Sequence, residues 1–188
     1  LTDNNALNDT HTFTALVEEK IGTADWAPVE TGTVVTWTVT PTPSTPGAAT
    51  CTTVGTTGQC SITINSNAPG TFTANAKVTH AHVAGQSLTR DTAGESGPGG
   101  SGAAVKKYVT ARISILQNAT NAVNDPHTFT VKVEKHDGSD WSAANGVTVT
   151  PALVAGSVGT ITGGTCQSGT TAGAGECTRA HRLRGLYE

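Results

Sequence analysis

The four cysteines have the clearest chemistry in this sequence, and they form two closely spaced pairs. Cys51 and Cys60 are separated by eight residues, and Cys166 and Cys177 by ten. Local pairing would close two short loops and stabilise the fold by roughly 2–3 kcal/mol per bond. Four thiolates could instead hold zinc, but zinc sites favour Cys-x-x-Cys spacing, which neither pair has. We therefore predict two disulfides and an oxidising compartment.

Histidines and oxygen-bearing side chains suggest two metal sites. His80 and His82 alternate along an expected strand, so both imidazoles would lie on one face and could bind Zn²⁺ or Ni²⁺. A solvated strand end is the other interpretation. Asp9, Asn124 and Asp125 lie where two halves of the chain would join, and such junctions can hold Ca²⁺. Turn formation explains the same residues equally well, because Asn and Asp bond to nearby backbone. No other cofactor is expected.

The remaining residues do not predict catalysis. The sequence has no catalytic triad spacing, no recurring pair of acids and no phosphate-binding loop, so we expect no enzyme. Charged residues make up only 13% and the net charge is −3, which argues against nucleic acid as a partner. No apolar run reaches the roughly 18 residues needed to cross a bilayer. We expect no membrane insertion of this segment, and any signal or anchor to lie outside it.

An internal repeat organises these residues. Residues 6–14 return as residues 122–130, at a spacing of 116 residues. Further matches join residues 25–26 to 140–141, 38–41 to 148–151 and 58–60 to 175–177. The offset drifts by a few residues between matches, as loop insertions between fixed strands would cause. One structural unit is therefore expected to be encoded twice.

Apolar residues alternate with polar ones in each copy, which is typical of strands with one buried face. The residues expected to face inward are Phe13, Ala15, Val17, Val35, Trp37, Val39, Ile62, Ile64, Phe72, Ala74, Ala76 and Val78, then Val109, Ala111, Ile113 and Ile115 in a last strand. Threonine dominates the outer positions and suits an exposed sheet. Short strands separated by Gly, Pro, Asn and Ser predict a β-sandwich.

The order of these strands resembles the bacterial immunoglobulin-like repeats of the invasin and intimin type. The resemblance is carried by residues 11–14, 35–39, 58–64 and 70–76, and it covers residues 6–115 and part of 122–178. It implies an all-β chain of tandem immunoglobulin-like sandwiches used as a surface adhesin or stalk. The cysteine pairs and a long Gly-rich loop depart from the family pattern, and they leave another use open, such as a filament subunit.

We expect three segments along the chain. Residues 1–115 form a complete repeat with a long, flexible Gly-rich loop at 84–104, residues 116–178 form a truncated repeat, and residues 179–188 form a tail outside the repeat. A shortened gene fragment or a frame change would explain the missing closing strands. Alternatively, the second repeat is left with an open apolar groove that a strand of another chain fills by β-augmentation.

The function predicted from the sequence is structural. We expect an extracellular or cell-surface, secreted module that acts as a stalk or spacer of a bacterial surface protein, with neighbouring repeats or other copies of itself as partners. The alternative is a self-assembling filament subunit that polymerises by strand complementation of the second repeat. Carbohydrate binding is a weaker alternative, because only Trp26, Trp141 and Tyr108 could offer an exposed aromatic platform. The sequence does not identify a host ligand.

Overall fold

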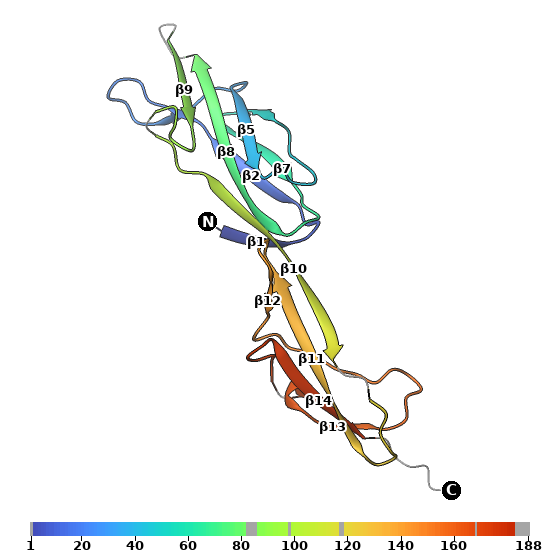
Figure 1. Cartoon of the computed structure of the whole chain (residues 1–188). Helices are drawn as coiled ribbons and strands as arrows, with labels where there is room; N and C mark the ends of the chain where they lie inside the picture. The colour runs from blue at the N-terminus through green and yellow to red at the C-terminus, as the bar shows by residue number, and fades with distance from the viewer. Residues whose placement is uncertain (1, 82–85, 98, 117–118, 168, 183–188) are drawn as a thin grey trace. The chain divides into compact units, whose positions relative to one another are not determined.

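The computed structural model describes residues 2–81, 86–97, 99–116, 119–167 and 169–182. Within these ranges, segments of alternating apolar and polar residues form strands. One 3₁₀ turn, Thr165–Gln167, is the only helical element in these ranges, so the all-β prediction is confirmed. No helix there is long and apolar enough to cross a membrane. The chain divides into two units, Leu1–Val109 and Thr110–Glu188 (Figure 1).

The first unit is a sandwich of two sheets. Its strands are β1 (Thr2–Ala6), β2 (His11–Leu16), β3 (Glu18–Glu19), β4 (Ala27–Pro28), β5 (Val34–Thr40), β6 (Thr50–Thr52), β7 (Gln59–Ile64), β8 (Gly70–Ala81), β9 (Ser87–Asp91) and the first half of β10 (Ala104–Leu116). The larger sheet has the order β1-β10-β8-β5-β6, with β9 also paired to β8. Strands β2 and β7 form the smaller sheet, and β3 pairs with β4.

Aromatic side chains from both sheets meet in one core. Phe13 and Ile62 come from the smaller sheet, while Trp37, Phe72 and Tyr108 come from the larger one. The ring centroids of Phe13 and Trp37 lie 6.3 Å apart. Phe72 and Tyr108 meet edge to face at 5.5 Å. Two sheets whose inner side chains pack into one core in this way form an immunoglobulin-like sandwich.

A disulfide joins the two sheets of the first unit. Cys51 lies on β6 of the larger sheet and is bonded to Cys60 on β7 of the smaller sheet. The indole Nε1 of Trp37 donates a hydrogen bond to Cys51 Sγ at 3.0 Å. The local cysteine pair therefore closes a short loop and also ties the layers together beside the largest ring of the core.

The predicted alternation holds for β2, β5, β7 and β8 but is wrong for β10. Val109, Ala111, Ile113 and Ile115 were expected to be buried in one core, yet Tyr108 is the fully buried residue at the start of this strand. Ile113 and Ile115 lie opposite core residues of the second unit but are 64% and 66% exposed. The reason is a change of partner within the strand. Up to position 109 its even-numbered residues face the core of the first unit, and from position 110 it pairs with a strand of the second.

The segment 84–104 is not a single flexible loop. Strand β9 lies within it and pairs with the end of β8. Beyond the strand, Thr92 N–H donates to the carbonyl of Ala76 at 2.9 Å, and Gly102 N–H donates to the carbonyl of Thr92 at 2.8 Å. These hydrogen bonds fasten both ends of the Gly-rich stretch to the sheet.

The second unit is smaller. Its strands are the second half of β10, β11 (Pro126–His136), β12 (Trp141–Ala143), β13 (Thr160–Gly163) and β14 (Glu176–Arg182). Their order is β10-β11-β14-β13, with β12 also paired to β11. The core contains Val131, Val133, Ala144, Val149 and the disulfide between Cys166 and Cys177.

The unit boundaries differ from those expected from the sequence. The division lies between Val109 and Thr110 rather than after position 115, because β10 is shared by the two units. The expected tail begins inside a strand, since Arg179–Arg182 complete β14 and pair with β11 and β13. Residues 183–188 of that tail lie outside the described residues.

The same strand pair occurs in both units with matching hydrogen bonds. Strands β11 and β14 pair in the register of β2 and β7. Val17 N–H donates to the carbonyl of Gly58 at 2.8 Å, and Val133 N–H donates to that of Gly175 at 2.8 Å. Both glycines have positive φ, and an added Cβ would collide with the carbonyl of the same valine. The Gly-x-Cys spacing therefore reflects a turn that only glycine fits.

One match in the sequence is displaced in the structure. Residues 148–151 have the same sequence as residues 38–41, but their hydrogen bonds show that they occupy the structural positions of residues 34–37 in the first unit. Thr33 N–H donates to Thr53 Oγ1 at 3.0 Å, and Val147 N–H donates to Thr171 Oγ1 at 3.1 Å. Position 147 therefore corresponds to position 33, and the buried Val149 takes the place of Val35.

Candidate functional site

The candidate interaction site lies on the inner face of β14. In the first unit, Ile62 and Ile64 of β7 are 4% and 0% exposed, because the larger sheet covers them. The strand register places Arg179 and His181 at the same positions of β14. Both are only partly buried. The second unit therefore carries polar side chains where the first has core isoleucines.

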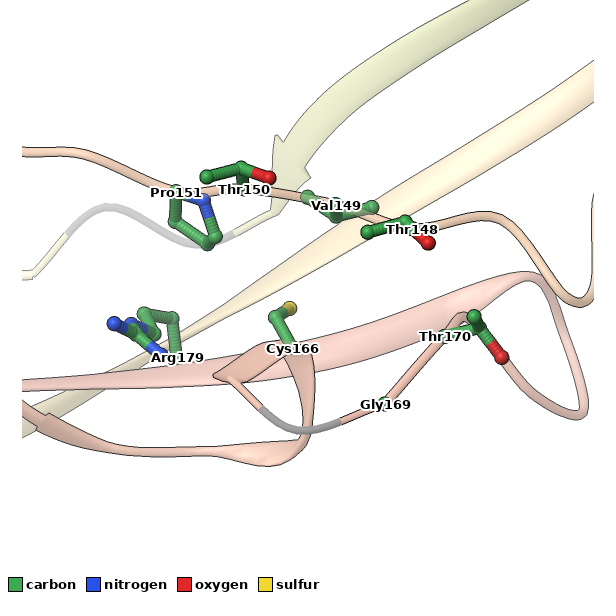
Figure 2. A pocket seen from close by; sticks show the side chains of 8 residues that line it. All are labelled: Thr148, Val149, Thr150, Pro151, Cys166, Gly169, Thr170 and Arg179. Atoms are coloured by element: carbon green, nitrogen blue, oxygen red, sulfur yellow. The ribbon is translucent and has the colours of Figure 1, made fainter.

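A pocket of about 410 Å³ opens beside this face. Figure 2 shows the segment from Thr148 to Pro151 along one side and Cys166, Thr170 and Arg179 along the other. In the first unit, side chains of β8 and β10 pack against the corresponding face. No strand in the described part of the second unit corresponds to β8.

Pro151 explains why residues 148–151, on the opposite side of the pocket from β14, do not form a strand like β5 of the first unit. It takes the position of Trp37, whose N–H donates to the carbonyl of Ala49 at 2.8 Å in the first unit. Proline has no N–H and cannot make this bond. Segment 148–151 accordingly makes a single bridge, from Thr148 to Thr170, in place of a strand.

Arg179 gives the pocket unused hydrogen-bond donors. Its Nε and Nη1 atoms are buried and have no hydrogen-bond partner among the described residues. Buried donors without partners are unfavourable, so an incoming acceptor would relieve this cost.

The histidine pair of the sequence is seen only in part. His80 Nε2 lies 3.3 Å from Glu19 Oε2, so this imidazole faces a carboxylate. His82 lies outside the described residues. Across the residues that are described, no three His, Cys, Asp or Glu side chains come together.

The residues considered for calcium form turns. Asn8 and Asn124 have φ values of 67° and 72°, the left-handed conformation that asparagine tolerates. Asp9 N–H donates to the carbonyl of Ala6 at 3.3 Å, and Asp125 N–H closes the equivalent turn at 3.0 Å. These turns lead into β2 and β11. Calcium binding at Asp9, Asn124 and Asp125 stays a prediction.

A charged cluster on β10, β11 and β12 was missed in the sequence. Arg112 Nε lies 2.7 Å from Glu134 Oε2, and Lys132 Nζ lies 3.0 Å from Glu134 Oε1. The hydrogen bond from Arg112, and then that from Lys132, holds the pKa of Glu134 below its usual range. Arg112 also lies 4.2 Å over the ring of Trp141. These residues come together only through strand pairing, so their spacing along the chain did not predict the cluster.

The aromatic residues considered for sugar binding do not form one platform. Tyr108 is fully buried, and burial raises the pKa of its phenol. Trp141 is covered by Arg112. Trp26 is 59% exposed. Trp141 is still 37% exposed, but a single exposed tryptophan in each unit is not the extended aromatic surface that the carbohydrate interpretation requires.

Comparisons with known proteins add little to this description. The sequence matches no protein-family model and no curated protein. Among solved structures, the chain aligns with one described as "D0-D1 domain of Intimin", with 20% identity over 97% of this chain and 80% of that chain. The TM-score of this alignment is 0.37. Because a score this low means that the two chains do not superpose well, the fold assignment depends on the strands and contacts described above.

Proposed function

We propose that this chain is a pair of immunoglobulin-like repeats from a bacterial surface protein, which act as a stalk, spacer or adhesive module. The observation that supports this is the strand pair β2–β7, which recurs as β11–β14 with the same register, the same glycine turn and a disulfide from its second strand. Repeated units of this kind are suited to a stalk, because each unit has its own core and lengthens the protein.

The chemistry of the described residues supports a structural role. The groups with a shifted pKa are an aspartate in a turn, a buried tyrosine and a glutamate in an ion pair, namely Asp91, Tyr108 and Glu134. Each has a structural partner, whereas catalytic groups with shifted pKa usually gather in one cleft. Two disulfides support an extracellular location.

The second candidate function is a filament subunit that polymerises through the second unit. The pocket beside Arg179 supports it, because a strand added there would cover a face that β8 and β10 cover in the first unit. Main-chain pairing of an added strand is a common way to join protein subunits.

Sedimentation velocity of the oxidised chain over a wide concentration range tests the two proposals. A stalk segment is expected to sediment as one species whose coefficient does not change with concentration. A filament subunit is expected to give larger species as concentration rises, and electron microscopy of the same samples should then show fibres. Concentration-dependent fibres would contradict the stalk proposal, and a constant monomer would contradict the filament proposal.

A further inference from the structure

The first unit has a strand edge that its own described strands leave unpaired. Strand β2 pairs with β7 and with no other strand of the described residues. The bond from Val17 to Gly58 places the backbone groups of the odd-numbered residues toward β7. The N–H and C=O groups of Thr14 and Leu16 therefore point to the opposite edge.

The second unit shows what can occupy this edge. There, β11 pairs with β14 on one side and with residues 110–116 of β10 on the other. Its residues 130–136 make the second pairing, antiparallel, with Lys132 opposite Ser114. In the common register, Lys132 corresponds to Leu16. The edge that is free in the first unit is thus covered in the second by residues 110–116, the segment that enters that unit.

A groove of about 660 Å³ runs along the unpaired edge of β2. Phe13, Ala15 and Leu16 line it from β2, and Trp37, Ala76 and Leu88 line it from the larger sheet. Charged and titratable side chains also line the groove, namely Glu18, Glu19, Lys20, Lys77, His80, Arg90 and Asp91. Leu16 and Leu88 are 53% and 44% exposed. An open strand edge beside exposed apolar side chains is a site for adding a strand.

The strand that covers β11 has the complementary pattern. Ile113 and Ile115 lie opposite Val133 and Val131, which are core residues, so their side chains share the inner face of the sheet. They remain mostly exposed, because no described strand of the second unit lies over them. On β2 of the first unit, side chains at these positions would enter the groove beneath the larger sheet.

We propose that the groove along β2 binds the terminal strand of another immunoglobulin-like unit. This strand would run antiparallel to residues 14–20 and would have the alternating apolar residues seen in residues 110–116. This inference rests on the proposed repeat organisation for its choice of partner. The edge of β2 would then be covered by a strand in the way that residues 110–116 of β10 cover the edge of β11 within the second unit.

Binding of a synthetic peptide with the sequence of residues 110–116 to the full oxidised chain tests the proposal. Fluorescence anisotropy of the labelled peptide should show saturable binding. A peptide with the changes I113D and I115D should bind about tenfold more weakly or worse, because its carboxylates would leave water to lie beside Val17 and Ala15. Absence of saturable binding, or equal binding of both peptides, would overturn the proposal, whereas the stalk proposal would stand or fall on sedimentation.

Variants of the chain locate the binding site. Leu16→Pro removes an N–H that points away from β7 and should weaken peptide binding about tenfold, whereas Leu16→Ala keeps that N–H and should retain most of the binding. Hydrogen exchange of the unmodified chain gives an independent measurement. The amides of Thr14 and Leu16 should exchange more slowly with peptide, and those of Thr130 and Lys132 should not change. Protection at Thr130 and Lys132 alone would show strand exchange in the second unit and contradict the proposal.

Discussion

A buried threonine hydroxyl fastens one loop to another in each unit. Thr53 Oγ1 accepts from Thr33 N–H and donates to the carbonyl of Glu30 at 2.6 Å. Thr171 Oγ1 accepts from Val147 N–H in the same way. Both threonines are almost completely buried, at 1% and 2% exposure. A hydroxyl in such a place is selected for its hydrogen bonds, because a lost partner leaves buried backbone groups unsatisfied.

Replacement of this hydroxyl should destabilise each unit separately. Thr53→Val or Thr171→Val keeps the side-chain shape but removes both hydrogen bonds, so each should lower the free energy of unfolding by about 1–3 kcal/mol. Denaturant unfolding of the oxidised chain measures this. Thr38→Val, at an exposed position of β5, should cost less than about 0.5 kcal/mol. A buried variant as stable as the exposed control would refute the role given to the hydroxyl.

The ion pairs of Glu134 predict a dependence of stability on pH. Its pKa is lowered in the folded state, first by Arg112 and then by Lys132, so the charged form favours folding. This contribution is present above the ordinary pKa of glutamate and is lost as pH falls through the lowered pKa. Thermal unfolding should therefore show that Glu134→Gln loses less stability than the unmodified chain when the pH falls from neutral to acidic. Glu18→Gln, at the matching position of β3, is the control, and an equal pH effect in both variants would contradict the assignment.

The sequence predicted residues whose chemistry is local and missed those that depend on strand pairing. Cys51 and Cys60 could be paired because eight residues are enough for a tight loop. The contact of Arg112 with Glu134 joins two strands, and no spacing rule relates positions 22 apart in the chain. The displaced match at residues 148–151 has a related cause, since identical letters do not fix which backbone groups pair.

At the scale of elements, alternation predicts strands well when one strand serves one core. Strand β7 alternates buried and exposed residues along its whole length, as expected. Strand β10 breaks the rule because its inner face changes at the unit boundary, from Tyr108 in the first unit to Ile113 in the second. Strand β9 was missed because the glycines that follow it predicted a loop over 84–104, and because its pairing with β8 holds it in place.

Strand β14 carries a testable departure from its counterpart β7. Arg179→Ile would give β14 the residue that β7 has at the equivalent position, Ile62. It would also remove two buried guanidinium donors that have no partner in the described structure. The second unit should gain about 1 kcal/mol, because replacing a poorly paired buried charge with an apolar side chain is often stabilising. Arg112→Ile, which breaks the ion pair with Glu134, should lower stability in the same chemical denaturation assay. Loss of stability in both variants would show that Arg179 has a stabilising partner.

At the scale of the molecule, the two units differ in how much core they bury. The first has an aromatic core shared by two sheets, whereas the described core of the second consists of small aliphatic side chains and a disulfide. Less buried apolar surface gives less stability. We therefore expect the second unit to unfold before the first, with its disulfide carrying a larger share of its stability.

Stretching single molecules of the chain should reveal both units and both disulfides. The cysteines of the first pair are 9 positions apart and those of the second 11, and an intact bond withholds the enclosed residues from extension. Two unfolding events are expected under oxidising conditions, the weaker from the second unit, and reduction should lengthen each by about 3 nm at 3.3–3.6 Å per residue. A chain with Cys51→Ser and Cys60→Ser should keep this lengthening in the weaker event alone, because only Cys166 and Cys177 remain bonded. A single event, or lengths that reductant does not change, would mean that the two units do not act as separate disulfide-bonded modules.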